Sequence, residues 1–139
     1  SEIFRNDWGE FFGNHKPNQI NVSKSEPGII RAWHRHLRDQ VDFFTVIKGT
    51  VKICICDNNP DSKTFGTLVE IITSEKQLQI VKVPGHYWHG TKTISSDESY
   101  TVYFINNLYN YENPDEERIP WDDPNIIDPR TKQPYNWGV

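Results

Sequence analysis

The sequence predicts an all-β protein, a single domain built as a sandwich or barrel of short strands. Short runs of β-branched and aromatic residues recur along the chain and are separated by turn-forming residues, a pattern typical of such folds. The apolar residues show no amphipathic helical period over three or more turns. A chain of 139 residues has the length of one domain and can bury a core without disulfides.

Five segments carry the expected strands. Each is rich in residues that fit a pleated, half-buried surface. In chain order they are FFTVIK (43–48), TVKICIC (50–56), TLVEII (67–72), LQIVKV (78–83) and YTVYFI (100–105). Gly49 and the polar segments 58–66, 73–77, 84–86 and 94–99 separate them and are typical of turns. Residues 113–139 contain five prolines, so we expect an irregular tail that packs on the domain.

Composition excludes several classes of protein. The formal net charge of −4 argues against a nucleic-acid-binding protein, which would be basic. No apolar run approaches the roughly 20 residues of a membrane span, and the N-terminal residues do not resemble a signal peptide. Cys54 and Cys56 lie two residues apart on one expected strand, so their side chains point to the same face. We expect both to be buried free thiols. Free thiols favour a cytoplasmic location over a secreted one.

Histidines at alternate positions form the first candidate site. His34 and His36 are two residues apart, so on a strand their side chains point to the same face. Arg31 has the opposite parity and joins them only if a bulge or bend intervenes. His86 and His89 follow a Pro-Gly turn, from which a histidine could face the same cavity.

A tyrosine on the last expected strand is the second candidate. Alternation places Thr101 and Tyr103 on one face, with Val102 and Phe104 on the other. A tyrosine on the inner face of a barrel needs a hydrogen-bond partner or a substrate for its hydroxyl group. The acidic segment 114–124, in contrast, is typical of a solvated surface.

Six motifs, in order and at nearly constant spacing, resemble the sugar-nucleotide epimerases typified by dTDP-4-dehydrorhamnose 3,5-epimerase. The resemblance covers most of the chain, up to about residue 124. The matching segments are Arg5-x-x-Trp8-x-Glu10, Gln19-x-Asn21-x-Ser23-x-Ser25-x-x-Gly28-x-x-Arg31-x-x-His34, Ser62-Lys-Thr64-Phe65-Gly66, His89-Gly90, Tyr103 with Tyr109, and Pro114-x-x-Glu117-x-Ile119-x-Trp121-Asp-Asp123-Pro124.

The resemblance implies a cupin fold, which is a double-stranded β-helix or jelly roll. It also implies a homodimer that uses no metal or cofactor. The implied substrate is a nucleotide-diphosphate 4-keto-6-deoxyhexose, linked to dTDP or CDP, which the enzyme would epimerise at C3, or at C3 and C5.

The resemblance also implies roles for individual residues. His34 would be the base, and Tyr103 the acid on the opposite face of the sugar. Arg31 and His89 would line the sugar pocket, Arg5 would meet the diphosphate, and Trp8 and Glu10 would meet the nucleotide base across the dimer. The other candidate substrate-binding residues are Gln19, Asn21, His36, Asp42 and Tyr109. A neutral imidazole, with a pKa near 6.5, is a plausible base at physiological pH.

Two departures from the family pattern concern the catalytic apparatus. The family lysine that would stabilise an enolate falls on Asp42, which has the opposite charge. The family's C-terminal aspartate, which orients the catalytic histidine, has no counterpart in this sequence, and Asp42 is the candidate to replace it. A reduced apparatus favours one epimerisation, at C3, over two.

Three alternative functions stay open at this point. A related cupin class, the sugar 3,4-ketoisomerases, also carries Arg-x-x-His-x-His, which Arg31, His34 and His36 match. A metal-dependent cupin enzyme would use His34, His36, Asp42 and His89, whose spacing approximates the metal signature of cupins. The third alternative is a sugar-nucleotide binding module without catalytic activity.

Overall fold

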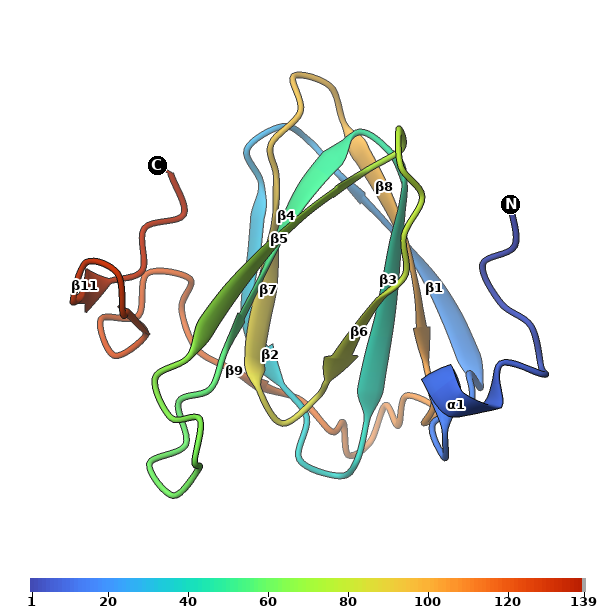
Figure 1. Cartoon of the computed structure of the whole chain (residues 1–139), viewed down its shortest axis with the longest axis horizontal. Helices are drawn as coiled ribbons and strands as arrows, with labels where there is room; N and C mark the ends of the chain where they lie inside the picture. Colours follow the sequence, from blue (N-terminus) through green and yellow to red (C-terminus); the bar gives the residue numbers. More distant parts are fainter. Residues whose placement is uncertain (139) are drawn as a thin grey trace.

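A computed structural model describes residues 1–138 and contains one short helix and a series of antiparallel strands (Figure 1). The prediction of an all-β protein is confirmed. The elements are α1 (Gly9–Phe12), β1 (Gln19–Ser25), β2 (Ile30–Arg35), β3 (Val41–Lys48), β4 (Thr50–Cys56), β5 (Leu68–Ser74), β6 (Val81–Pro84), β7 (Trp88–Thr93), β8 (Ser99–Ile105), β9 (Glu117–Arg118), β10 (Ile127–Asp128) and β11 (Gln133–Pro134).

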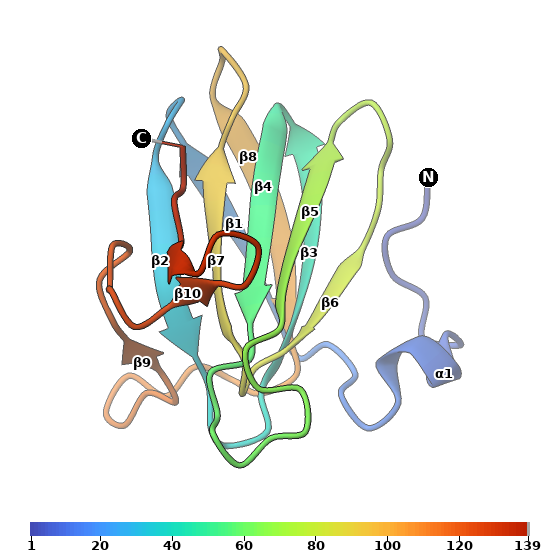
Figure 2. The same cartoon turned by 60° about the vertical axis from the view of Figure 1, so that its left-hand side comes forward.

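Two antiparallel sheets face each other and form the walls of a barrel (Figures 1 and 2). The four-stranded sheet has the order β1-β8-β3-β6, and the five-stranded sheet has the order β5-β4-β7-β2-β9. Strands β1 and β8, about 80 residues apart in the chain, pair along the whole length of both strands, from Gln19 opposite Ile105 to Ser25 opposite Ser99. Segments far apart in sequence therefore build each wall.

Four of the five expected strands lie at or close to their predicted positions, in β3, β4, β5 and β8. The fifth, expected over 78–83, is shorter and spans Val81–Pro84. Strand β1 was absent from the predicted runs because its apolar residues face outward. Ile20 is 62% exposed and Val22 is 66% exposed, so their alternation does not mark a core strand.

Apolar residues form three clusters around the walls. One, which includes Val46, Ile53 and Val83, fills part of the space between the sheets. The second packs Phe12 of α1 against Phe43 and Phe104 on the outer side of the four-stranded sheet. The interior between the sheets is thus only partly filled with apolar side chains, which leaves room for a cavity.

The third cluster attaches the C-terminal tail to the outer face of the five-stranded sheet (Figure 2). Trp33 of β2 and Trp137 of the tail are almost completely buried, with ring centroids 5.0 Å apart. Cys54 and Cys56 lie in this cluster as free thiols, and burial raises their pKa values to about 12 and about 11. Their prediction as buried thiols is confirmed. Val139, the last residue of the expected tail, lies outside the described residues.

Among residues 1–138, no helix has the length and apolar character that crossing a bilayer requires.

Replacing Trp137 by alanine should destabilise the protein strongly, because it opens a cavity between the tail and the sheet. We expect a loss of about 3–5 kcal/mol in the free energy of unfolding, measured by chemical denaturation. Trp121, which is 40% exposed, provides the matched control, and Trp121→Ala should cost much less. Equal losses in the two variants would contradict a role for the Trp33–Trp137 contact in holding the tail.

Candidate active site

A cavity of about 710 Å³ lies between the two sheets and is lined mainly by polar side chains. Alternate residues of β1 and β8 form one wall. The lining residues there are Gln19, Asn21, Ser23 and Ser25 of β1, and Ser99, Thr101, Tyr103 and Ile105 of β8. The predicted parity of β8 is confirmed, because Val102 and Phe104 pack on the opposite side of the sheet, against α1. Polar alternation thus marks the inner face of these strands.

The opposite wall comes from β2 and β7. The pairing of β2 with β7 shifts register between Arg31 and His34, and both residues line the cavity. The bulge that the parity of Arg31 required is therefore present. The Arg31 guanidinium donates a hydrogen bond of 2.8 Å to Ser25 Oγ, which links the end of β1 to β2 across the cavity.

His34 lies in this wall in a form suited to accept a proton. Burial lowers its pKa to about 4, with a further contribution from the nearby His89. The ring is therefore neutral at physiological pH and keeps a free lone pair. His34 Nδ1 lies 3.3 Å from Glu116 Oε1, an ion-pair distance, but the two groups are not aligned for a hydrogen bond, and Nδ1 has no hydrogen-bond partner among residues 1–138.

Glu116 corrects two expectations. Asp42 was the candidate carboxylate to support His34, but the acidic side chain beside His34 is Glu116. The segment 114–124 was expected to be solvated surface, yet β9 pairs with β2 and brings Glu116 and Asp115 to the cavity. An acidic run alone gave no signal for this placement, because it depends on the pairing of Arg118 with His34, which brings the neighbouring residues Asp115 and Glu116 to the cavity.

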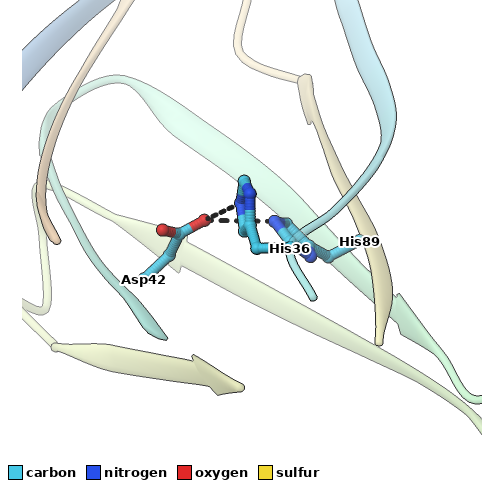
Figure 3. A group of neighbouring side chains, drawn as sticks. All are labelled: His36, Asp42 and His89. Carbon is cyan, nitrogen blue, oxygen red and sulfur yellow. Dashed lines mark hydrogen bonds and ion pairs between the residues drawn. The ribbon is translucent and has the colours of Figure 1, made fainter. Parts of the chain in front are cut away.

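Asp42 instead binds two other histidines (Figure 3). His36 Nε2 and His89 Nε2 each lie 3.1 Å from the same oxygen, Asp42 Oδ2. The other oxygen, Oδ1, accepts a hydrogen bond of 2.8 Å from Gln40 Nε2. All three members of this group are buried.

Interactions between Asp42 and the two histidines outweigh the effect of burial on the pKa values of Asp42 and His36. Burial alone would raise the pKa of Asp42, but the two histidines overcome it and hold that pKa far below its ordinary value. For His36, burial alone would lower the pKa, but the hydrogen bond and charge of Asp42 outweigh it and raise the pKa. The carboxylate is therefore ionised at the inner wall of the cavity.

Tyr103 stands on the other sheet, beside Asn21 of β1 and Phe44 of β3 in the strand register. Burial raises its pKa, and the negative charge of Asp42 adds to this effect. The phenol therefore keeps its proton at physiological pH and can donate it. His34 and Tyr103 line one cavity from opposite walls.

The sequence-predicted binding residues divide into two groups. Those that line the cavity are Gln19, Asn21, Arg31, His36, Asp42, His89 and Tyr109. Three others, Arg5, Trp8 and Glu10, lie outside its lining. Arg5 pairs with Asp7 at 2.7 Å, Trp8 stacks on Phe12, and Glu10 is exposed on α1.

Comparison with known proteins agrees with this fold and cavity. A family model described as dTDP-4-dehydrorhamnose 3,5-epimerase matches residues 1–128. A probable low-salt glycan biosynthesis epimerase of Haloferax volcanii is 43% identical over 87% of this chain and 76% of its own length. The spore coat polysaccharide biosynthesis protein SpsL of Bacillus subtilis is 34% identical over 100% of this chain and 85% of its own.

A solved structure adds a ligand-bound relative. The dTDP-6-deoxy-D-glucose-3,5-epimerase RmlC of Legionella pneumophila, in complex with dTDP-4-keto-L-rhamnose, superposes with a TM-score of 0.78 at 26% identity. The match covers 90% of this chain and 66% of that protein, so the chain spans slightly less than two thirds of its length. The chain belongs to the dTDP-4-dehydrorhamnose 3,5-epimerase family, and its two-sheet barrel is the cupin fold of these proteins.

Gly90 explains why the His-Gly motif needs glycine. An added Cβ at Gly90 would overlap the Cβ of Ala32, in the bulge of β2, and would lie 3.0 Å from the Arg31 carbonyl oxygen. Gly90→Ala should therefore push the bulge away and cost about 1–3 kcal/mol, measured as a lower free energy of unfolding. Gly9→Ala is the control, because a Cβ there meets nothing within 4 Å. An unchanged stability of Gly90→Ala would contradict the close packing of β7 on the bulge.

Proposed function

We propose that this protein epimerises a nucleotide-diphosphate 4-keto-6-deoxyhexose at C3. The observation that carries the proposal is the placement of His34 and Tyr103 on opposite walls of one cavity. Inversion of a carbon centre beside a ketone needs proton removal from one face and proton return to the other. A neutral imidazole and a protonated phenol on opposite walls of a cavity of about 710 Å³ meet that requirement.

Each group has the protonation state that its role needs. His34 can accept the C–H proton because burial keeps its ring neutral. Tyr103 can deliver a proton because burial and Asp42 keep its hydroxyl protonated. Glu116, close to His34 Nδ1, would stabilise the imidazolium that forms when His34 takes up a proton.

The names of the relatives support the substrate class. The Legionella protein was solved with dTDP-4-keto-L-rhamnose, a nucleotide-linked keto sugar. The Haloferax and Bacillus relatives are named for glycan and spore coat polysaccharide biosynthesis. We assign to this protein the preparation of an activated deoxysugar for a glycan, in the cytoplasm, a location that its two free thiols also favour.

Deuterium exchange tests this function directly. Wild-type protein, incubated with dTDP- or CDP-4-keto-6-deoxyglucose in D₂O, should incorporate deuterium at C3 with inversion, as read by NMR. His34→Asn should abolish the exchange. Tyr103→Phe should keep exchange with retention, because the base can return deuterium to its own face, while inversion falls roughly 10²–10⁴-fold. Tyr100→Phe, on the same strand with its hydroxyl bonded to Glu98, is the matched control.

Other outcomes would identify the alternatives. A 3-keto product would indicate a ketoisomerase, and nucleotide binding without exchange would indicate a binding module. Deuterium at both C3 and C5 would contradict inversion at one centre alone. His36 is a poor base for a ketoisomerase, because both of its ring nitrogens already have partners, Asp42 and the Asp115 carbonyl oxygen.

We also propose that the protein acts as a homodimer that pairs along β1. This strand is an edge of the four-stranded sheet, and Ile20 and Val22 expose apolar side chains there. Exposed apolar edges of this kind are typical of protein interfaces. A dimer would also give a role to Arg5, Trp8 and Glu10, which lie outside the cavity of their own chain and would reach the nucleotide in the cavity of the partner.

A charged double variant tests the dimer. Wild-type protein should sediment at about twice the chain mass of 16.3 kDa, whereas Ile20→Glu with Val22→Glu should sediment as a monomer. Val69→Glu is the control, because Val69 is also exposed but lies on β5, at the edge of the other sheet. A wild-type monomer, or dissociation by the control variant, would contradict pairing along β1.

A further inference from the structure

Glu116 lies between two partners at the wall of the cavity. Its Oε2 atom accepts a hydrogen bond of 3.1 Å from Arg118 Nη2, and its Oε1 atom lies 3.3 Å from His34 Nδ1. The hydrogen bond to Arg118 is formed, whereas His34 Nδ1 has no hydrogen-bond partner among residues 1–138. The contact of Glu116 is therefore complete on the side of Arg118 and incomplete on the side of His34.

The backbone on both sides of Glu116 is fixed, so only side chains need to move for Glu116 to change partner. The carboxylate of Asp115 accepts two hydrogen bonds of 2.9 Å from backbone N–H groups in the connection between β2 and β3. On the other side, Ile119 and Trp33 exchange two backbone hydrogen bonds of 3.1 and 3.2 Å. Within this frame, a rotation of the Glu116 carboxyl group is enough to align it with the imidazole ring.

Arg118 is suited to bind an anion that enters the cavity. Within residues 1–138, two side chains with a permanent positive charge line the cavity, those of Arg31 and Arg118. The Arg31 guanidinium is already bonded to Ser25 Oγ and to the carbonyl oxygen of Lys24. The Arg118 side chain is 68% exposed and is paired with Glu116. An accessible guanidinium matches the geometry of a phosphate group.

The strand register places Arg118 beside the reacting sugar. Arg118 lies directly opposite His34 in the pairing of β9 with β2. The inference rests on the proposed function, in which the sugar lies between His34 and Tyr103. The diphosphate is attached to C1 of that sugar, so its negative charges lie within a few bonds of the ring and within reach of a side chain next to His34.

We propose that Arg118 binds the diphosphate of the substrate and thereby releases Glu116 to accept a hydrogen bond from His34 Nδ1. Arg118 is then a substrate-binding residue, and Glu116 is a positioning residue for His34. A hydrogen bond from Nδ1 fixes the tautomer in which the Nε2 lone pair can take up the substrate proton. Binding of the nucleotide part of the substrate thus completes the base.

The charges around His34 agree with this coupling. Burial is the largest effect that lowers its pKa to about 4, and His89 adds to it. Glu116 raises this pKa, whereas the positive charges of Arg118 and His36 lower it. A diphosphate bound to Arg118 would offset the charge of that residue and leave the effect of Glu116, which makes His34 a stronger base.

Binding of a nucleoside diphosphate tests the first part without turnover. The probes are dTDP and CDP, and the dissociation constants are measured by calorimetry. Arg118→Gln should weaken binding roughly 10-fold, because a charge-assisted contact is lost. Glu116→Gln should not weaken it, because the guanidinium stays free. Arg35→Gln is the matched control, since Arg35 also pairs with a glutamate of β9, Glu117, but lies outside the cavity lining. Wild-type protein that binds neither probe, or Arg118→Gln protein with wild-type affinity, would overturn the proposal.

NMR of the His34 ring tests the second part. In wild-type protein, dTDP should shift the Nδ1–H signal of His34 downfield, as a hydrogen bond to a carboxylate does, and thymidine, which has no phosphate, should not. In Arg118→Gln the signal should lie downfield without dTDP, and in Glu116→Gln it should not respond. Circular dichroism establishes which variants are folded. A wild-type signal that stays unmoved at saturating dTDP overturns the coupling even if both variants fold poorly.

Turnover separates the two roles. Arg118→Gln should act mainly on KM and raise it roughly 10-fold, whereas Glu116→Gln should act mainly on kcat and lower it roughly 10²-fold. The same loss of kcat in both variants, with KM unchanged, would contradict the division of roles. An absence of deuterium exchange in all forms, with the dTDP-dependent shift of His34 intact, would contradict the proposed function and leave the coupling standing.

Discussion

The contact of Asp42 with His36 and His89 holds the two walls of the barrel together at the cavity. Asp42 belongs to β3 in the four-stranded sheet, His89 belongs to β7 in the five-stranded sheet, and His36 lies in the connection between β2 and β3. Removing one partner from such a buried ionic contact typically costs about 3–5 kcal/mol, because a charge is left buried without compensation. The same group therefore joins the sheets, and the charge of Asp42 adds to the effect of burial in raising the pKa of Tyr103.

The polar interior explains which parts of the fold could be read from the sequence. Strands β3, β4, β5 and β8 contain apolar runs, because at least one face of each packs in a core. Strand β1 reverses the usual pattern, with Gln19 and Asn21 inside and Ile20 and Val22 outside. Its alternation is as regular as that of a core strand, but a rule that places apolar residues inside assigns it no strand or the wrong face.

The candidate site was predictable where local geometry decided it. The parity of Tyr103 and the bulge that Arg31 required both follow from the two-residue period of a strand. His34 and His36 both line the cavity as expected, but β2 ends at Arg35, so His36 reaches the cavity from the connection that follows the strand. Glu116 and Asp115 could not be found in this way, because they depend on pairing between segments about 80 residues apart. The sequence shows that Asp42 replaces the family lysine with the opposite charge. Its partners His36 and His89 could not be predicted, because the fold brings β3, β7 and the connection between β2 and β3 together at this point.

The chain order of these elements has a consequence for how the protein reaches its native state. Strand β1 must wait for β8, because within the described part of the chain Gln19–Ser25 pairs only with Ser99–Ile105. The last side of the cavity comes from residues 115–118, which follow β8 in the chain. High contact order slows folding, since loop-closure entropy is lost before the distant contacts form. On the ribosome, strand β1 therefore emerges with its backbone hydrogen-bonding groups unpaired, and it depends on the synthesis of β8 before pairing protects it from aggregation.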